Sequence, residues 1–562
     1  MSIALTEEQL AIQGSVRDAA ARANTLACVR AMETAPSGWT THWPDLATLG
    51  LFAITLPELL GGVGGTLVDQ AAAVEQAAED LVPGPVLPTV LATLLVGDPA
   101  LRAALAAGQV TAAVALGPGS LTAASTNGDG GLLVSGTVEP VLGAHRDATL
   151  VLCARDGDGR AVWFTVEPRP GVEVIPLTPL DFSRPLGRVT LDEVRIPAAD
   201  VLHLDSPTVL GRAATLFAAE AAGVARRSLD TAVAYAKVRE QFDRPIGSFQ
   251  SIKHLCAEML CRAEQAAALA WDAARAPDGS LSAPAAAALA LDAAVDNAKD
   301  CVQILGGIGF TWEHDAHLYL RRALANRQLI GGSARWRRQV ADLAIAGVRR
   351  RLGVVADDER ARAAARTFAT EVGALSTSAQ RARLAESGYL MPHWPLPYGL
   401  AASPRAQLVI EEELAAEGIR RPDLVIGGWA VPTILAHGTE AQQERFALPT
   451  LRGELHWCQL FSEPGAGSDL AALRTKAVRV DGGWSLSGQK VWTSAAARAD
   501  WGICLARTDP AAAKHAGITY FLVDMRADGI TLRPLREITG EARFNEEEIG
   551  RASCRERVYG LV

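Results

Sequence analysis

The stretch from Gln459 to Asp469, QLFSEPGAGSD, gathers residue types that bind ligands. The hydroxyls of Ser462 and Ser468 can donate or accept hydrogen bonds, and the glycines between them let the backbone come close to a bound group. No lysine follows the glycines, so the stretch is not a phosphate-binding P-loop, and it has no metal-ligand spacing. We expect a turn that holds a ligand.

A second group of residues could bind an anion. Arg239 and Gln241 stand at the end of a predicted helix, just before Phe242 and the helix-ending RPIG. A guanidinium offers forked, charge-assisted donors to a pyrophosphate. The glycines of QILGGIG (303–309) could let backbone N–H groups approach the same anion. Two structural alternatives stay open, in which Arg239 pairs with a surface acid and the glycines only allow helices to pack closely.

The composition favours a soluble, largely helical protein of several domains. The chain has 562 residues, of which 49% are hydrophobic and only 5% aromatic. Its net charge of −9 argues against nucleic acid as a partner, and no apolar run approaches the roughly 20 residues of a membrane helix. The N-terminus has no apolar signal-peptide core. Eight scattered cysteines without a C-x-x-C pair suit a reducing cytoplasm, and the ten histidines lack zinc-site spacing, so no metal is expected.

The chain contains an internal repeat. Residues 131–180 and 483–535 share one order of short apolar alternations, an S-G turn, a strand ending in A-R and a final G-(V/I)-x-(V/L) strand. Such alternation, bounded by Gly, Asp and Pro, predicts antiparallel strands. A segment of about a hundred residues with helical periodicity precedes each β block, and long helices follow only the first. We therefore expect a second copy that is incomplete.

The expected domains follow this repeat. They are a helical domain (1–110), a β domain (111–204), a helical bundle (205–353), a linker (354–368), a second helical domain (369–453), a second β domain (454–546) and a tail (547–562). From Glu547 the sequence is polar and without an evident strand period, so we interpret the tail as a non-native extension.

The motifs resemble those of the flavin-dependent acyl-CoA dehydrogenases. The segments 221–259 and 301–323 are similar to that family's C-terminal bundle, and CQLFSEPGAGSD with GQKVWTSAAARAD is similar to its β domain. The resemblance covers residues 1 to about 546. It implies an α+β, mostly helical fold: a helical domain, a small β domain and a helical bundle, then the incomplete copy. The tandem arrangement resembles the fused dehydrogenases of actinobacterial sterol side-chain degradation, in which one half is degenerate.

The resemblance implies FAD as the cofactor and assigns residues to it. The diphosphate and adenosine end would be held by Arg239, Gln241, Phe242, Gln303, Gly306 and Gly307. In the second β domain, Ser462 and Ser468 would contact the flavin and phosphate, Trp492 would lie against the ring, and Ser494 would reach flavin N5. An indole face can cover an isoalloxazine face, although Trp492 alone would pass for an ordinary sheet aromatic.

The first β domain lacks these ring contacts. Aligned on the repeat, Gly117 stands for Ser462, Pro140 for Trp492 and Leu142 for Ser494. The first copy thus keeps the diphosphate residues and the second keeps the ring residues. The simplest interpretation is one FAD per chain, bound between the two copies as a pseudo-dimer, with further homo-oligomers possible.

No residue qualifies as the catalytic base. The family's two positions for the carboxylate that removes the α proton fall on Ile330 and near Ala213, neither of them acidic. Glu313 and Asp315 are expected to cap a helix, and Glu220 to be a helix-surface or buried-pair residue. The base is therefore expected in the bundle that the second copy lacks.

The sequence predicts an FAD-dependent acyl-CoA dehydrogenase that forms an α,β-enoyl-CoA. By resemblance, the substrate is a bulky acyl-CoA such as a sterol or bile-acid side chain, and electron-transfer flavoprotein is the acceptor. Two alternatives remain open. One is an acyl-CoA oxidase or flavin monooxygenase on the same fold, and the other is a non-catalytic scaffold that binds FAD or acyl-CoA.

Overall fold

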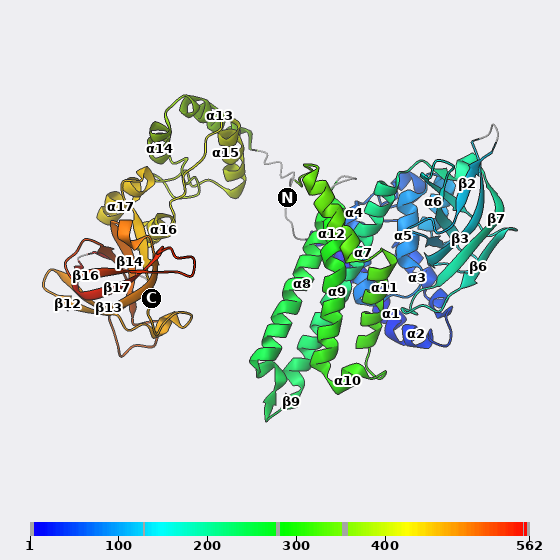
Figure 1. Cartoon of the computed structure of the whole chain (residues 1–562), viewed down its shortest axis with the longest axis horizontal. Helices are drawn as coiled ribbons and strands as arrows, with labels where there is room; N and C mark the ends of the chain where they lie inside the picture. Colours follow the sequence, from blue (N-terminus) through cyan, green and yellow to red (C-terminus); the bar gives the residue numbers. More distant parts are fainter. Residues whose placement is uncertain (1–4, 127–129, 277–280, 351–357, 555, 559–562) are drawn as a thin grey trace. The chain divides into compact units, whose positions relative to one another are not determined.

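The computed structural model describes residues 5–126, 130–276, 281–350, 358–554 and 556–558. The chain divides into two compact units, residues 1–353 and 354–562, which we describe separately. Figure 1 shows a large helical bundle beside a sheet in the first unit, and small helices with a second sheet in the other. None of the helices in the described ranges combines the length and apolar character that a membrane span requires.

Unit 1 begins with a group of helices, two of which start at a capping box. Thr6 caps the first helix and Thr66 the fourth, each in a reciprocal capping box with the residue three positions on, which satisfies free backbone N–H groups. The helices are α1 (Glu7–Ala23), α2 (Thr25–Ala31), α3 (Trp43–Thr48), α4 (Leu67–Glu79), α5 (Val86–Leu95) and α6 (Pro99–Ala106), with short 3₁₀ turns at η1 (Gly38–Thr41) and η2 (Glu58–Leu60).

A sheet of eight strands follows these helices. Its strands are β1 (Ala112–Val114), β2 (Thr122–Ser125), β3 (Leu132–Leu142), β4 (Thr149–Arg155), β5 (Ala161–Val166), β6 (Val172–Pro176), β7 (Leu186–Ile196) and β8 (Val201–Leu202), with the turn η3 (Ala198–Asp200) before β8. The order is β6-β7-β3-β1-β4-β5-β8, and β2 pairs with both β3 and β4. The predicted antiparallel pairings occur, but β1 and β2 run parallel to β4.

The bundle of unit 1 is built on one long helix. Helix α7 (Ser206–Val238) starts at Asp205, whose side chain accepts from Thr208 N, and the alanines along it allow close packing against its neighbours. The rest of the bundle consists of β9 (Glu240–Gln241), β10 (Arg244–Pro245), η4 (Ile246–Ser248), α8 (Gln250–Arg275), α9 (Ser282–Leu305), α10 (Gly307–Phe310), α11 (Ala316–Leu329) and α12 (Ser333–Ile345).

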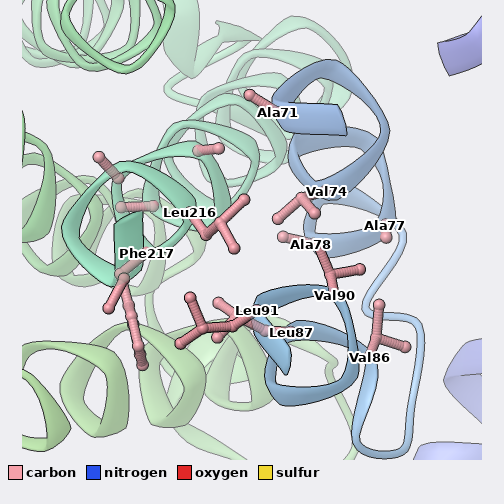
Figure 2. Packing of buried hydrophobic residues seen from close by; sticks show 14 of the residues in the cluster. Ala71, Val74, Ala77, Ala78, Val86, Leu87, Val90, Leu91, Leu216 and Phe217 are labelled. Carbon is pink, nitrogen blue, oxygen red and sulfur yellow. The ribbon is translucent and has the colours of Figure 1, made fainter. Parts of the chain in front are cut away.

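The core of unit 1 lies where α4, α5 and α7 meet. Figure 2 shows Leu216 and Phe217 of α7 with Val74 of α4 and Leu91 of α5, all of them fully buried. At Gly223 the backbone of α7 lies directly against that of α4, because a Cβ there would lie 2.0 Å from the Glu75 carbonyl oxygen. Glycine is therefore required at this crossing.

A buried ionic cluster joins the first sheet to the bundle. Arg184 lies in the β6–β7 connection and donates to Asp181 at 2.9 Å and to Glu220 of α7 at 2.9 Å. Arg322 of α11 contacts Asp181 at 2.5 Å and Glu220 at 3.5 Å. Burial opposes ionisation of Asp181, but the two guanidinium groups outweigh it and lower the pKa of this carboxyl to about 2. Glu220 is thus a buried-pair residue, one of the two alternatives expected for it.

Unit 2 repeats the order of helices followed by a sheet. Its helices are α13 (Glu359–Gly373), α14 (Thr377–Glu386), α15 (Pro404–Ala416), α16 (Gly427–His437) and α17 (Glu440–Arg452). Its strands are β11 (Trp457–Leu460), β12 (Lys476–Val480), β13 (Gly483–Ser494), β14 (Trp501–Arg507), β15 (Ile518–Asp524), β16 (Ile530–Leu535), β17 (Phe544–Cys554) and β18 (Glu556–Val558), with the turns η5 (Leu470–Ala472) and η6 (Ala496–Arg498).

The two sheets share one strand order apart from one pairing. The second runs β16-β17-β13-β12-β14-β15-β18, with β11 paired to β14. β12 corresponds to β2 and β11 to β1, and β1 differs in that it also pairs with β3 at one residue. The registers agree as well. Ser494 at the end of β13 pairs with Phe544, just as Leu142 at the end of β3 pairs with Leu186.

Two expected boundaries were wrong. Residues 359–368 of the predicted linker belong to α13, since ERARAAARTF consists mostly of strong helix formers. The strand pattern does not stop at residue 546, because β17 continues to Cys554 and pairs with β13. The alternation there was hidden because two of its buried positions, Asn545 and Glu547, are polar. Residues 354–357 of the linker, with 555 and 559–562 of the tail, lie outside the described residues.

Glu75 is an acid buried inside unit 1. It lies on α4, and its Oε2 accepts from Trp271 Nε1 of α8 at 2.8 Å. The charged groups that act on it are Glu79 on its own helix, Arg226 on α7 and Glu264 on α8. Burial raises the pKa of Glu75 to about 7, against an ordinary 4.5. Because folding favours the protonated form, this group's contribution to stability is complete below about pH 4.5 and is lost as pH rises through 7.

We predict that Glu75→Gln stabilises the protein at pH 8 by about 2–3 kcal/mol and changes little at pH 5, because the amide cannot ionise. Calorimetric unfolding of the full chain at both pH values checks this. Glu33→Gln, at an exposed position in the same unit, is the control. Equal melting temperatures of Glu75→Gln and the parent protein at pH 8 would contradict the prediction.

Candidate functional site

The stretch 461–469 forms a tight turn directly after β11. Glu463 N donates to the Ala466 carbonyl at 3.1 Å, and Ala466 N donates back to the Glu463 carbonyl at 3.0 Å. Val491 N of β13 donates to the Ser462 carbonyl at 3.0 Å. The turn is therefore held to the middle of the sheet, and Ser462 and Ser468 project from it, half-buried and exposed respectively.

A buried ion pair lies beneath this turn. Lys490 of β13 is fully buried, and its Nζ donates to Glu463 Oε1 at 2.9 Å, to the Phe461 carbonyl at 3.0 Å and to the Leu505 carbonyl at 2.8 Å. The Glu463 carboxyl also accepts from the backbone N–H groups of Arg474 and Thr475. Burial opposes its ionisation, but these hydrogen bonds and the ammonium keep the pKa of Glu463 below its usual value.

Trp492 and Ser494 lie at the C-terminal end of β13, the strand that also carries Lys490. A bulge falls between Val491 and Thr493, and Trp492 sits in it with φ +65°, a left-handed conformation that turns its side chain out of the regular alternation. The indole is 63% exposed and meets the Phe544 ring edge-on at 6.4 Å. Between them, buried Thr493 donates to Glu547 Oε2 at 2.6 Å.

These residues supply donors that the fold does not use. Within the part of the chain that the structure describes, the hydroxyls of Ser462, Ser468 and Ser494 have no protein hydrogen-bond partner, and no atom lies within 4 Å of where a Cβ of Gly465 or Gly467 would be. Three free hydroxyls and an exposed indole fit the polar edge and the face of a flavin ring. This donor set suits FAD, and we find no packing reason for it.

The counterpart positions in unit 1 do not fit a flavin ring. The strand registers match Ser462 with Gly117, Trp492 with Pro140 and Ser494 with Leu142. A cavity of about 360 Å³ lies there, lined mainly by apolar side chains that include Pro140, Leu142 and Leu329. The hydroxyl and indole groups of unit 2 are thus replaced by hydrocarbon.

The residues expected to bind the diphosphate lie at one end of the unit 1 bundle. Arg239 ends α7, and Gln241 belongs to the β9–β10 hairpin, whose turn residues Phe242 and Asp243 have φ of 56° and 60°. Phe242 is 86% exposed and meets Phe249 edge-on at 5.9 Å. The hairpin and α10 lie at the same end of the long helices in Figure 1.

The QILGGIG glycines have separate roles. Gly306 ends α9 with φ 63° and ψ −135°, a conformation that essentially only glycine adopts. Gly309 packs tightly, since a Cβ there would lie 2.7 Å from Leu305 Cβ. Gly307 has open space beside it, and Gln303 is exposed on α9. Close packing therefore explains why Gly309 is a glycine. The unusual backbone conformation explains why Gly306 is one.

No carboxylate in unit 1 stands at the two positions expected for a base. Ile330 and Ala213 are buried and apolar, and Glu220 is held by the two arginines. The turn that holds Glu313 and Asp315 caps α11, as expected. Asp315 stands at the N-cap position but its carboxylate pairs with Arg30 at 2.6 Å, and the ring of His314 accepts from Ala316 N. Among the described residues, no three His, Cys, Asp or Glu side chains are grouped to hold a metal ion.

Sequence reasoning missed the Lys490–Glu463 pair. Both residues belong to the motifs SEPGAGSD and GQKVWTS, but they are 27 positions apart in the sequence. In addition, a charged residue in a strand normally indicates a face exposed to solvent. A lysine at an inward position of the alternating GWSLSGQKVW segment was the available signal.

Comparisons with known proteins bear on both units. Family models for acyl-CoA dehydrogenases match along the chain: the N-terminal domain at residues 6–106 and again at 349–454, the C-terminal domain at 207–345 and the middle domain at 458–549. Together these models cover most of the chain.

Individual proteins similar to this chain are also acyl-CoA dehydrogenases. Acyl-CoA dehydrogenase FadE34 of Mycobacterium tuberculosis is 54% identical over 97% of this chain and 77% of its own length. Acyl-CoA dehydrogenase IpdE2 of Mycolicibacterium smegmatis is 34% identical over 50% of this chain and 81% of its own length.

Two solved structures are similar to part of the chain. The steroid acyl-CoA dehydrogenase Tcur3481-Tcur3483 is 27% identical with a TM-score of 0.56, over 61% of this chain and 98% of that one. The ChsE4-ChsE5 complex of Mycobacterium tuberculosis is 25% identical with a TM-score of 0.56, over 61% of this chain and 99% of that one. This chain belongs to the acyl-CoA dehydrogenase family, the FAD-containing oxidoreductases that act on a CH–CH group.

Proposed function

We propose that this protein introduces an α,β double bond into a bulky acyl-CoA, such as one carrying a sterol or bile-acid side chain. The observation that carries the proposal is the unit 2 set of Ser462, Ser468 and Ser494, whose hydroxyls have no protein partner among the described residues, beside the 63% exposed Trp492 indole; a flavin ring would satisfy them. The steroid assignment is supported by the 27% identical steroid dehydrogenase.

We propose further that the chain contains two copies of the family's architecture. Unit 1 carries the helical domain, sheet and bundle, and unit 2 carries the helical domain and sheet. The shared strand order of the two sheets and the two matches to the N-terminal domain support this division. The first sheet keeps the fold without the ring-binding residues.

The two units carry different parts of the cofactor-binding set. Arg239, Gln241, Phe242, Gln303, Gly306 and Gly307 of unit 1 would bind the diphosphate and adenosine end of FAD. In unit 2, Ser494 would donate to the ring edge, Trp492 would cover one face and exclude water, and Ser462 and Ser468 would hold the remaining polar edge. When bound, the flavin supplies the hydride acceptor for oxidation of the acyl chain.

We predict that the full chain binds one equivalent of FAD. The apolar first sheet offers no hydroxyl where Ser462 and Ser494 stand in unit 2, so a second ring has no counterpart site. Titration of apoprotein with FAD, followed by flavin fluorescence and equilibrium dialysis, gives the stoichiometry. Saturation at two equivalents would show that the first sheet binds a ring despite its apolar lining.

We predict separable effects for the two residue groups. Arg239→Gln removes a charge-assisted contact to phosphate, so FAD affinity should fall about 10- to 100-fold while the absorption spectrum of bound flavin is unchanged. Arg244→Gln, on the hairpin that follows Arg239 and with its guanidinium 4.1 Å from the centre of the Phe249 ring, is the matched control.

Ser494→Ala should instead shift the flavin absorption spectrum, because it removes a donor to the ring. Reversed effects, with Arg239→Gln altering the spectrum and Ser494→Ala altering only affinity, would contradict the residue assignment.

The substrate class is tested by binding and by reduction. We expect a steroid side-chain acyl-CoA to perturb the flavin absorption of the loaded protein at concentrations at least tenfold lower than butyryl-CoA does. Where the substrate bleaches the flavin anaerobically, reoxidation should require electron-transfer flavoprotein. Rapid reoxidation by air with release of peroxide would identify an oxidase instead, and equal affinity for both thioesters would overturn the steroid assignment.

A further inference from the structure

The Lys490 ammonium joins three separate segments of unit 2. Its three acceptors are the Phe461 carbonyl at the start of the turn, the Glu463 carboxylate within it, and the Leu505 carbonyl on β14. A lysine has three N–H donors, so all of them are used. The side chain is fully buried, and this geometry leaves the ammonium no contact with water.

The Glu463 carboxylate closes the other end of the same segment. One oxygen accepts from Arg474 N at 2.6 Å, and the other accepts from Thr475 N at 2.9 Å as well as from Lys490. The ion pair therefore joins residues before and after the serine-bearing stretch 462–468. It also links that stretch to β13, four positions before Ser494.

We propose that Lys490 and Glu463 are positioning residues that fix the ring-binding hydroxyls of Ser462, Ser468 and Ser494 relative to one another. The inference rests on the proposed flavin function of unit 2. Neither charged group contacts the proposed ring site directly. The pair acts by setting the path of the turn and its distance from the end of β13.

The first sheet provides an internal comparison. By the same strand registers, Glu463 corresponds to Pro118 and Lys490 to Val138. Val138 is buried in an apolar core, so the sheet forms without the ion pair. The first sheet thus lacks both the Lys490–Glu463 type of ion pair and the residues proposed to bind the flavin ring. This is expected if the ion pair is needed for the ring-binding site and not for formation of the sheet.

Burial of two charges is a costly way to stabilise a sheet. Removing one partner leaves the other uncompensated in the interior, whereas replacing both by apolar groups is often neutral or stabilising. Single and double variants therefore separate a structural role from a positioning role. A purely structural pair would let the double apolar variant recover both stability and flavin binding.

The experiment compares Lys490→Met, Glu463→Gln and the double variant Lys490→Met/Glu463→Met in the full chain. The control is Lys514→Met, because Lys514 pairs with Asp469 of the same turn at the same 2.9 Å but on the exposed surface. Each protein is measured for melting temperature without FAD, for FAD dissociation constant, and for the absorption spectrum of bound flavin.

We expect the double variant to melt within a few degrees of the parent while its FAD dissociation constant rises at least tenfold and its flavin spectrum shifts. Lys514→Met should match the parent in all three measurements. Parent-like FAD affinity and spectrum in the double variant would overturn the positioning role. Failure of the parent protein itself to bind FAD would instead overturn the proposed function, so the two failures are distinguishable.

Discussion

The buried contact between Lys490 and Glu463 sets the shape of the second sheet's candidate site. A charge in the interior requires partners, and here two N–H groups of the ammonium donate to the turn, at Phe461 and Glu463, and the third donates to Leu505 on β14. Satisfying that charge holds the serine-bearing turn against β13. The serine hydroxyls then have set places without hydrogen bonds of their own to the protein, and the bulged Trp492 contacts only the edge of the Phe544 ring among the ring contacts of the described residues.

Unit 1 uses buried charge for a different purpose. Asp181, Arg184, Glu220 and Arg322 form a cluster with no net formal charge, in which each carboxylate meets both guanidinium groups. The cluster ties the β6–β7 connection to α7 and α11. It joins a sheet to helices, and the cavity that Asp181 and Arg184 help to line is otherwise lined mainly by hydrocarbon.

Much of the fold could be predicted from the sequence because periodicity and turn residues are local signals. The alternation in 131–180 and 483–535 indicated strands, and the alanine-rich segment after residue 205 indicated long helices. Long-range contacts are not local signals. The ion pair between Arg30 and Asp315 joins residues 285 positions apart, and no local pattern in either segment predicts it. Buried Asn545 and Glu547 hid the alternation of β17, since polar residues at inward positions are read as exposed.

The same limit applies to the candidate site. Serines, glycines and a tryptophan in known motifs could be identified from their types, whereas the charged pair that positions them could not. The paired strands also show which positions the fold itself requires. Where β13 and β17 bury Lys490 opposite Glu547, β3 and β7 bury Val138 opposite Val189. In the first sheet, Val138 and Val189 form the same strand pairing and no charged group has to leave water. Packing alone would therefore favour two valines over a lysine and a glutamate at these positions. Retention of the charged residues in only one sheet is therefore a constraint from the site above them, and not from the sheet.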